Sequence, residues 1–164
     1  MIRAATSDDL PGILAIYNDA VLHSTAIWNE TPVDLENRAR WFAERTGRGF
    51  PVLVADDGDG KVAGYASFGD FRPFEGYRLT VEHSIYVRAD VRGKGIGRAL
   101  LGTLVMEAER MGKHAIVGGI EAGNISSIRL HEQFGFTRVG LLPQVGIKFG
   151  RYLDLLFMQR TFGH

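Results

Sequence analysis

The sequence predicts one mixed α/β domain that covers residues 1–164. Segments with the patterns of strands and helices alternate along the chain, without a low-complexity segment, an internal repeat or a linker rich in proline and serine. A chain of 164 residues also suits one domain with one hydrophobic core. Near its centre a strand, a glycine-rich loop, a helix, a second strand and a second helix follow one another, which indicates an α/β architecture.

Seven segments have the composition of strands, and four have the spacing of apolar residues that helices show. The predicted strands are 2–5, 51–55, 62–68, 81–87, 115–120, 136–140 and 152–159. The predicted helices begin at Asp8, at Thr31-Pro32 and after residue 97, where the third runs to about Met111, and the fourth spans Ser126 to Phe134. Thr6 or Ser7 can cap the first helix, and Gly135 can end the last one in a left-handed conformation.

Composition and charge exclude several classes of function. Lys plus Arg and Asp plus Glu number 19 each, so the formal net charge is zero and no strong attraction to nucleic acid or a membrane surface is expected. The absence of cysteine excludes disulfides, thiolate metal sites and a cysteine nucleophile. The N-terminal residues lack the apolar stretch of a signal peptide, and no apolar run approaches ~20 residues, so a cytoplasmic enzyme is expected.

A glycine-rich loop, residues 92–97 with the sequence R-G-K-G-I-G, joins a predicted strand to a predicted helix. Its glycines let backbone N–H groups face inward, and successive N–H groups at a helix start bind anions with help from the helix dipole. Arg92, Lys94 and Arg98 add positive charge. The loop therefore predicts a pyrophosphate site, although a tight turn with surface cations has the same composition.

The usual nucleotide motifs do not fit this loop. The P-loop sequence G-x-x-x-x-G-K-[ST] is absent, and a Rossmann loop that started at Gly93 would need glycine where Arg98 stands. Nucleotide hydrolysis and hydride transfer therefore lose support.

The loop does fit the acetyl-CoA motif R/Q-x-x-G-x-G/A of the GCN-five-related N-acetyltransferase (GNAT) superfamily. Upstream, E-H-S-I-Y-V resembles the central strand of that superfamily, and downstream N-I-S-S-I-R-L-H-E-Q-F-G-F resembles its later helix. The strand order fits across nearly the whole chain. The resemblance implies the GNAT fold, in which a mixed, mostly antiparallel sheet of about seven strands is flanked by about four helices.

The resemblance narrows to one group within that superfamily. The segments T-V-E-H-S-I-Y-V, R-L-H-E-Q-F-G-F and V-G-I-K-F-G-R-Y-L-D-L-L-F-M-Q together resemble the N-acetyltransferases of phosphinothricin, methionine sulfone and methionine sulfoximine. The resemblance implies acetyl-CoA as co-substrate, no metal, a small amino-acid-like amine as acceptor, a detoxifying role and a homodimer.

Acetyl-CoA is expected to bind along the central strand and the glycine-rich loop. The resemblance implies that strand residues pair with the pantetheine arm and that loop amides hold the pyrophosphate. The cofactor-binding residues expected on this basis are Ile85, Tyr86, Val87, Arg92, Gly93, Lys94, Gly95, Ile96, Gly97, Arg98, Asn124 and Ser127. Asn124 can also be a plain helix cap after Gly123, and the two roles are compatible.

Glu82 is the first candidate for the base that takes the proton of the amine. A carboxylate is unusual among the apolar residues of the central strand, and a desolvated cleft would raise its pKa and favour proton removal, directly or through water. Alternation places Glu82, Ser84 and Tyr86 on one face of the strand and His83 on the other. Without the resemblance, a glutamate that faces solvent or pairs with an arginine is the simpler interpretation; the resemblance implies a catalytic one.

His131 is the second candidate, as a general acid or as part of a proton relay. It stands where many members of the superfamily carry tyrosine, and the phosphinothricin group has histidine there. A histidine can protonate the departing CoA thiolate, and the alternative is a packed helix histidine. Histidines 23, 83, 114 and 164 show no spacing that suggests a metal site.

The loop 71–78 is the expected acceptor site because it is rich in arginine and aromatic residues. The residues expected to bind the acceptor are Phe71, Arg72, Phe74, Tyr77 and Arg78. Arginines can bind the carboxylate of an amino acid with bidentate geometry, and aromatic rings can enclose its aliphatic stem. A surface loop with scattered arginines is the alternative. Residues 27–30 could close over the acceptor as a lid.

Two other functions compete with this prediction. One is acetylation of a protein N-terminus, a lysine or a polyamine, which usually needs an open groove for a peptide. The other is a non-catalytic sensor of acyl-CoA, which would keep the glycine-rich loop but lose the base and the acid. Because Glu82 and His131 are both present, the sequence favours an enzyme.

Overall fold

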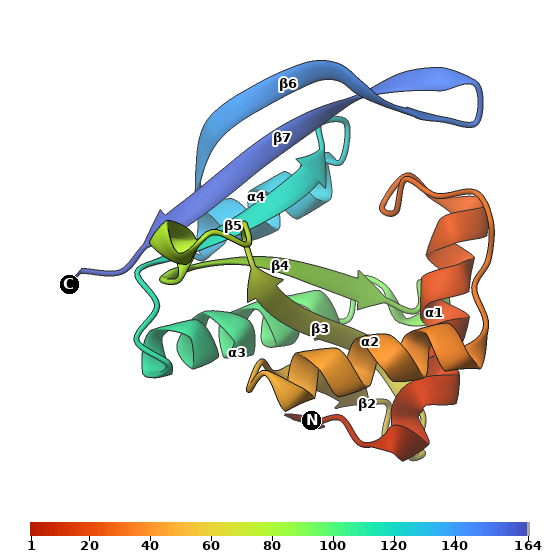
Figure 1. Cartoon of the computed structure of the whole chain (residues 1–164). Helices are drawn as coiled ribbons and strands as arrows, with labels where there is room; N and C mark the ends of the chain where they lie inside the picture. Colours follow the sequence, from red (N-terminus) through yellow and green to blue (C-terminus); the bar gives the residue numbers. More distant parts are fainter. Residues whose placement is uncertain (164) are drawn as a thin grey trace.

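A computed structural model describes residues 1–163, and His164 lies outside the described residues. Over that range the chain forms one seven-stranded sheet with the order β1-β2-β3-β4-β5-β7-β6, and four α-helices pack on its two faces (Figure 1). The strands are β1 (Ile2–Ala4), β2 (Val52–Asp56), β3 (Val62–Asp70), β4 (Thr80–Val87), β5 (Ala115–Glu121), β6 (Thr137–Lys148) and β7 (Arg151–Thr161). The helices are α1 (Leu10–His23), α2 (Leu35–Gly47), α3 (Ile96–Arg110) and α4 (Ile125–Gln133).

Neighbouring strands of the sheet are antiparallel, except that β4 and β5 are parallel. The predicted mixed, mostly antiparallel sheet is therefore confirmed. The connection from β4 to β5 runs through the glycine-rich loop and α3, as a parallel pair requires a crossover.

The sheet separates two hydrophobic layers. On one face α3 buries Leu100 and Leu104 completely, in a cluster that also contains Ile128 of α4. On the other face Ile13 of α1 and Tyr65 of β3 belong to a second cluster, to which residues of α2 add. We refer to these as the α3/α4 face and the α1/α2 face of the sheet.

The first two helices begin later than predicted. A 3₁₀ turn over Ser7–Asp9 precedes α1, and Thr6, one of the two predicted caps, stands before that turn. The Asp9 carboxylate accepts a hydrogen bond from the Thr6 amide at 2.8 Å and pairs with Arg3 through two further bonds. The α-helix therefore begins at Leu10, two residues later than predicted, because the 3₁₀ turn that Asp9 stabilises comes first.

The prediction that Thr31-Pro32 opens the second helix is also wrong. Asp34 is the N-cap of α2, and its carboxylate accepts a hydrogen bond from the Asn37 amide at 2.9 Å. The preceding segment stays extended because the Asn18 side chain of α1 bonds both the amide and the carbonyl of Val33, each at 2.9 Å.

The last two strands are longer than the predicted segments 136–140 and 152–159. Strand β6 continues past Pro143, which the sequence pattern places in a loop. Its register against β7 shifts between Leu142 and Gly146, and this bulge accommodates a proline that has no amide hydrogen to donate. The resulting β6–β7 hairpin projects over the sheet toward the end of α1 (Figure 1).

Lys148, near the tip of this hairpin, fastens it to α1. Its side chain is completely buried, and its ammonium group donates hydrogen bonds to the carbonyl oxygens of Ala20, Ser24 and Ile27. A positive charge at the C-terminal end of a helix is favourable because the helix dipole is negative there. The hairpin and residues 27–30 are therefore held beside one another.

None of the helices within residues 1–163 combines the length and the apolar character needed to cross a membrane.

Candidate functional site

The two parallel strands at the centre of the sheet part halfway along their length. Paired residues of β4 and β5 run from Thr80 and Ala115 only as far as His83 and Gly118. We call this last pair the vertex. Beyond it, residues 84–87 of β4 no longer pair with β5, and Figure 1 shows the two strands diverging. Backbone N–H and C=O groups on the facing edges can therefore bind an extended ligand as an additional strand.

The glycine-rich loop lies at the open end of this splay, between β4 and α3. Gly93 and Gly95 have φ values of 82° and 83°, a left-handed conformation that glycine adopts without steric cost. A Cβ at either position would meet nothing within 4 Å, so backbone conformation rather than lack of space requires glycine. Gly95 is the N-cap of α3, and the first amides of a helix have no acceptor inside it. The free amides of this loop can therefore bind an anion.

The three cations predicted to assist this loop are all exposed. Arg92 donates to the Val87 carbonyl of β4 at 3.4 Å. Arg98 donates to Gln133 at 2.6 Å, and its guanidinium lies 5.6 Å from the centre of the Phe134 ring. Arg98 thus connects α3 to α4, and Ile96 and Gly97 beside it form the first turn of α3.

The other residues predicted to bind the cofactor lie along the two edges of the splay. Ile85, Tyr86 and Val87 stand on β4 beyond the vertex. Asn124 caps α4, because its side-chain oxygen accepts a hydrogen bond from the Ser127 amide at 3.2 Å. The capping role is therefore present, and the side-chain NH₂ group is not used by it.

Glu82 lies at the vertex on the α1/α2 face and is partly buried. Burial raises the pKa of its carboxyl group, while the positive charges of Arg72 and Arg45 oppose that rise. Gly119 of β5 leaves room beside it, since a Cβ there would lie 3.4 Å from the Glu82 Oε2 atom. A partly desolvated carboxylate with a raised pKa is suited to accept a proton.

Sequence reasoning missed Arg45, a cation of α2 that lies close to Glu82. Its guanidinium covers Gly69 of β3, where a Cβ would lie 2.9 Å from the Arg45 Cζ atom, and Gly69 is the register partner of Glu82. Arg45 also donates to the Ser67 hydroxyl at 3.2 Å. The only sequence signal is the glycine itself, because glycine inside a strand marks the close approach of another group.

Aromatic rings and a second arginine of α2 extend this side of the cleft. Tyr65 and Tyr86 lie with ring centres 5.3 Å apart, and the Arg38 guanidinium lies 4.1 Å from the centre of the Tyr17 ring. The Tyr65 hydroxyl is buried and has no hydrogen-bond partner among the described residues, and burial raises its pKa. Of these residues, only Tyr86 was predicted from the sequence to belong to the site.

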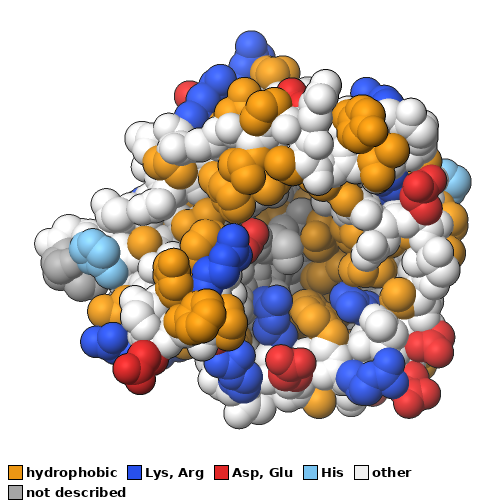
Figure 2. Space-filling model, turned by 45° about the horizontal axis from the view of Figure 1, so that its top comes forward, with side chains coloured by type: hydrophobic (Ala, Val, Ile, Leu, Met, Phe, Trp, Pro, Cys, Tyr) orange, Lys and Arg blue, Asp and Glu red, His pale blue; other side chains and the backbone are white. Residues whose placement is uncertain are grey.

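The loop 71–78 borders the cleft opposite α2. The Arg72 guanidinium lies 4.3 Å from the centre of the Phe71 ring, and its charge acts on Glu82. Phe71 also contacts Tyr77 and Phe157 of β7, with ring centres 5.9 and 6.1 Å apart. These rings line a cavity of about 280 Å³ on the α1/α2 face. Figure 2 shows a hollow with hydrophobic side chains on its walls and Lys and Arg side chains at its mouth.

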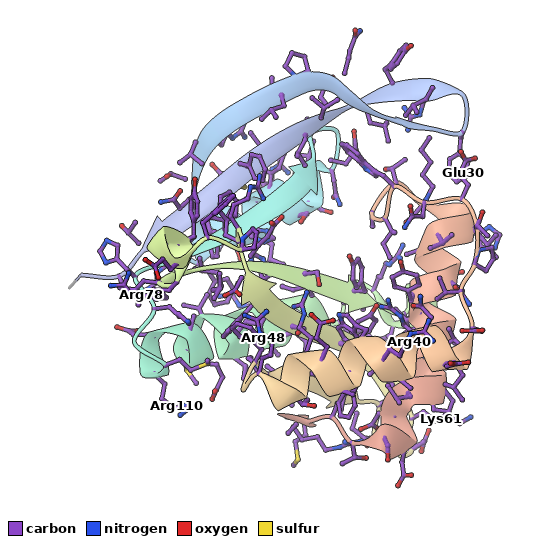
Figure 3. All side chains as sticks on the ribbon, in the orientation of Figure 1. Glu30, Arg40, Arg48, Lys61, Arg78 and Arg110 are labelled. Carbon is purple, nitrogen blue, oxygen red and sulfur yellow. The ribbon has the colours of Figure 1, made fainter. Side chains whose placement is uncertain are left out.

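Two of the residues predicted in this loop point elsewhere. Phe74 is 72% exposed. Arg78 is exposed and donates to the Glu75 carbonyl at 3.4 Å, and Figure 3 places it at the outer edge of the molecule near the end of β7. The structure therefore brings Arg72, Phe71 and Tyr77 toward the cleft, but it does not bring Phe74 and Arg78 there.

On the α3/α4 face of the same vertex, His83 meets His131. Their Nε2 atoms lie 2.9 Å apart and their rings stack with centres 5.1 Å apart. Both are buried, and burial lowers the pKa of both. Sequence reasoning missed the partnership, because 48 residues separate the two and they meet only where α4 packs over Gly118 of β5, the register partner of His83.

The described part of the chain shows no evident set of ligands for a metal ion. Within residues 1–163 no group of three or more His, Cys, Asp or Glu side chains is arranged to hold a metal ion. His83 and His131 face each other and two carbonyl groups instead.

Comparison with known sequences supports the resemblance that the three motifs predicted. Residues 13–136 match the acetyltransferase (GNAT) family. The chain is 62% identical over 158 residues to an L-methionine sulfoximine/L-methionine sulfone acetyltransferase from Pseudomonas aeruginosa, across 96% of this chain and 92% of that protein. The predicted resemblance to this group is confirmed.

Solved structures agree with the fold. A GNAT superfamily phosphinothricin acetyltransferase from Sinorhizobium meliloti, in complex with acetyl-CoA, has a TM-score of 0.97 and 42% identity, across 99% of this chain and 88% of that one. A ribosomal-protein-alanine N-acetyltransferase from Brucella melitensis has a TM-score of 0.97 and 58% identity, across 99% of each chain.

Proposed function

The chain belongs to the acetyltransferase (GNAT) family, and we propose that it transfers the acetyl group of acetyl-CoA to the α-amine of methionine sulfoximine, methionine sulfone or phosphinothricin. One observation supports this proposal most directly. At the vertex, the free edge of β4 and the glycine-rich loop lie next to Glu82, a partly buried carboxylate whose pKa is influenced by two arginines. Residues 1–164 act as one catalytic domain in this proposal, in the cytoplasm and in a detoxifying role.

The splay provides a site for the acetyl donor. The amides of residues 93–98 hold the pyrophosphate at the start of α3, and the edge of residues 84–87 pairs with the amide groups of the pantetheine arm. This direction of binding brings the thioester to the vertex. There it lies between Glu82 on one face of β4 and the two histidines on the other.

Glu82 is the general base of this reaction. The acceptor enters from the α1/α2 face, because the hollow and the cavity beside loop 71–78 open on that side (Figure 2). Glu82 takes a proton from the ammonium group, directly or through a water molecule, so that the amine can attack the acetyl carbon. A backbone amide of β4 beyond the vertex stabilises the oxyanion that forms.

Arg72 and Arg45 recognise the carboxylate of the acceptor. Both lie close enough to Glu82 to influence its charge, so an α-amino group at Glu82 places the neighbouring carboxylate between two guanidinium groups. Phe71 and Tyr77 enclose the remainder of the acceptor. The roles of Phe74 and Arg78 in binding the acceptor are not part of this proposal.

Acetylation of a protein N-terminus is a second candidate function. The specific observation in its favour is the 58% identity to the ribosomal-protein-alanine N-acetyltransferase of Brucella melitensis. The first residue of a peptide has no free α-carboxylate, so it would not provide the anion that Arg45 and Arg72 can bind in addition to Glu82. A free amino acid therefore fits the charges of the cleft better.

A homodimer accompanies this proposal. Strand β6 is at the edge of the sheet, and the hairpin that it forms with β7 exposes seven large apolar side chains. These residues are Val139, Leu141, Leu142, Val145, Ile147, Phe149 and Tyr152. An exposed apolar edge strand favours pairing with another chain, and a second copy of this chain is its expected partner.

Thiol release from acetyl-CoA tests the proposed function. The acceptors to compare are L-methionine sulfoximine, L-methionine sulfone, L-phosphinothricin, unmodified amino acids, a polyamine, a lysine peptide and a peptide that begins with alanine. We expect turnover confined to the three analogues and related free amino acids. Turnover with a peptide or polyamine instead would contradict the substrate class, and binding of acetyl-CoA without turnover of any amine would favour a sensor.

A further inference from the structure

The contact between His83 and His131 is a built feature of the α3/α4 face. The two side chains are only 8% and 4% exposed. Gly118 makes space for them, since a Cβ there would lie 2.7 Å from the His83 Cε1 atom and 3.4 Å from the His131 Nε2 atom. The Phe136 ring closes over both imidazoles, with ring centres 5.5 and 5.1 Å away.

The hydrogen bonds of the pair determine where its protons lie. The His83 Nδ1 atom is 2.9 Å from the Val117 carbonyl oxygen, and the His131 Nδ1 atom is 2.7 Å from the Ser127 carbonyl oxygen. A carbonyl oxygen can only accept, so both Nδ1 atoms donate. A neutral imidazole carries one N–H, so two neutral rings would point two lone pairs at each other across 2.9 Å. One additional proton turns that repulsion into an N–H···N hydrogen bond.

Burial lowers the pKa of both imidazoles, so the N–H···N hydrogen bond is what holds one additional proton, and a second proton has no such bond. Within the described chain, the titratable group that faces His83 from β5, α4 and Phe136 is His131, because Glu82 lies on the other face of β4. Burial and the charge of His131 lower the pKa of His83 to about 3, while the Val117 carbonyl opposes this. The Ser127 carbonyl likewise opposes the effect of burial on the pKa of His131. A second proton therefore stays excluded near neutral pH.

We propose that His83 and His131 act as one acid unit, in which a single proton held between their Nε2 atoms is delivered to the CoA thiolate at the vertex. His83 is the positioning residue of this unit: it orients the His131 ring and shares the proton with it. The inference rests on the proposed function, because it assigns the source of the proton for the leaving group in that reaction.

The step balances in atoms and charge. The nitrogen–carbon bond of the product forms as the carbon–sulfur bond of the thioester breaks, and the electron pair of the latter stays on sulfur. The shared proton moves from the histidine pair to sulfur, which leaves both imidazoles neutral. On the way from ammonium to amide the nitrogen loses two protons: Glu82 takes the first before the attack and passes it to solvent, and then takes the second from the acetylated nitrogen. Solvent returns one proton to the histidine pair. The sum is the ammonium form of the acceptor plus acetyl-CoA giving the N-acetylamine, CoA and one proton.

A phenylalanine in place of His83 tests the unit by kinetics. His83→Phe keeps an aromatic ring in the site but can neither donate to His131 nor accept from it. We expect kcat with methionine sulfoximine to fall about 10- to 100-fold with the KM for acetyl-CoA unchanged, because a general acid contributes only to the chemical step. His83→Gln, whose amide can still bond to the His131 Nε2 atom, should recover part of kcat. His23→Phe, an exposed position of α1, is the matched control and should leave kcat unchanged.

The pH profile separates a role in proton transfer from a role in packing. An acid must be protonated to act, so kcat is lost as the pH rises through the pKa of the pair. A lone buried His131 releases its proton more readily than a shared pair does, so His83→Phe should move this basic limb to lower pH. A basic limb and a kcat that are identical to those of the unchanged protein would overturn the inference.

NMR of the histidine ring nitrogens tests the inference in the unchanged protein, so it does not depend on whether a variant folds. In the unchanged protein near pH 7 we expect protons on both Nδ1 atoms and one proton between the two Nε2 atoms. A ring with an unprotonated Nδ1 atom would contradict the inference. Turnover of methionine sulfoximine by the unchanged protein tests the proposed function separately, so the two proposals can fail independently.

Discussion

The two faces of strand β4 at the vertex differ in almost every physical respect, although the residues involved are neighbours in sequence. On the α1/α2 face, Glu82 is partly buried, and its pKa is raised by burial and lowered by the positive charges of Arg72 and Arg45. On the α3/α4 face, His83 is buried against His131 and Phe136, and its polar contacts are one imidazole and one carbonyl.

In the proposed mechanism, one strand serves two opposite proton transfers. A base that receives a proton from a soluble amine needs access to the acceptor and to water, and an open face provides both. An acid must keep its proton until the thiolate forms. It is therefore better buried, because in a buried site only the leaving group can take that proton. Alternation along a strand separates these environments by one residue.

The largest effect should come from removing the base on the open face. In Glu82→Gln we expect kcat to fall about 100- to 1,000-fold, because general base catalysis typically contributes 10²–10⁴-fold and water can partly replace it. Binding of acetyl-CoA should not change, since the glycine-rich loop is untouched. Steady-state kinetics with methionine sulfoximine and calorimetry with acetyl-CoA would measure the two quantities.

Glu75→Gln is the matched control for that variant. Glu75 is an exposed carboxylate of the loop 71–78, so the same chemical change should leave kcat as it was. The unchanged enzyme should also lose kcat as the pH falls through the raised pKa of Glu82, and Glu82→Gln should lack this acidic limb. A variant that kept the limb would assign it to another group.

The next largest effect should come from alanine at Gly118, on the α3/α4 face, compared with alanine at Gly119, on the α1/α2 face. A Cβ at Gly118 collides with the His83 ring at 2.7 Å in a packed interior, so we expect Gly118→Ala to lower the free energy of unfolding by about 1–3 kcal/mol and to reduce kcat. At exposed Gly119 the nearest contacts are 3.3 and 3.4 Å, to the ends of the Leu155 and Glu82 side chains, which can move. Gly119→Ala should therefore cost less than about 1 kcal/mol. Urea unfolding of both variants measures the contrast, and equal costs would contradict it.

The residues of the α1/α2 face were easier to predict from the sequence than those of the α3/α4 face, because the sequence signals for the α1/α2 face are local. Glu82 in an apolar strand, the glycines 93 and 95 before a helix, and Asn124 before α4 each stand out within a few residues, and alternation gives the face of Glu82 directly. All of these features reappear in the structure where the pattern placed them.

The contacts that were missed join distant segments. His131 of α4 meets His83 over Gly118 of β5, and the charge of Arg45 acts on Glu82 because Gly69 lets this helix side chain lie on the sheet. No local pattern encodes either geometry. The extension of β6 was missed for a related reason: Pro143 is tolerated by a bulge whose existence depends on pairing with β7.

Removal of the positive charge of Arg72 should change both the pKa of Glu82 and the binding of the acceptor on the α1/α2 face. Arg72 favours the ionised form of Glu82, so in Arg72→Gln we expect the pKa of Glu82 to rise further and the acidic limb of the pH profile to move to higher pH. The KM for the amino-acid acceptor should rise about tenfold, because a charged hydrogen-bond partner of the carboxylate is lost. Kinetics at several pH values measure both changes.

Arg78→Gln is the control for this variant, since Arg78 belongs to the same loop but lies exposed at the outer edge of the molecule (Figure 3). It should leave both the acidic limb and the KM for the acceptor unchanged. If Arg78→Gln raised KM as much as Arg72→Gln, the loop would bind the acceptor in an arrangement different from the one described, and the open face would extend further than the cleft beside α2.

The smallest effect should come from a substitution in the glycine-rich loop, the proposed acetyl-CoA site, which lies on neither face of β4 at the vertex. In Lys94→Gln we expect the KM for acetyl-CoA to rise only about two- to threefold at low salt, with kcat unchanged, because Lys94 is exposed and surface charges contribute little. The difference should shrink as salt is added, and Lys61→Gln, on another exposed turn, should show none. A rise of about 100-fold would correspond to ~2.7 kcal/mol and would mean that the side chain, rather than the backbone amides, holds the pyrophosphate. A modest effect leaves the binding energy with the amides, whose direction is fixed by the left-handed conformations of Gly93 and Gly95.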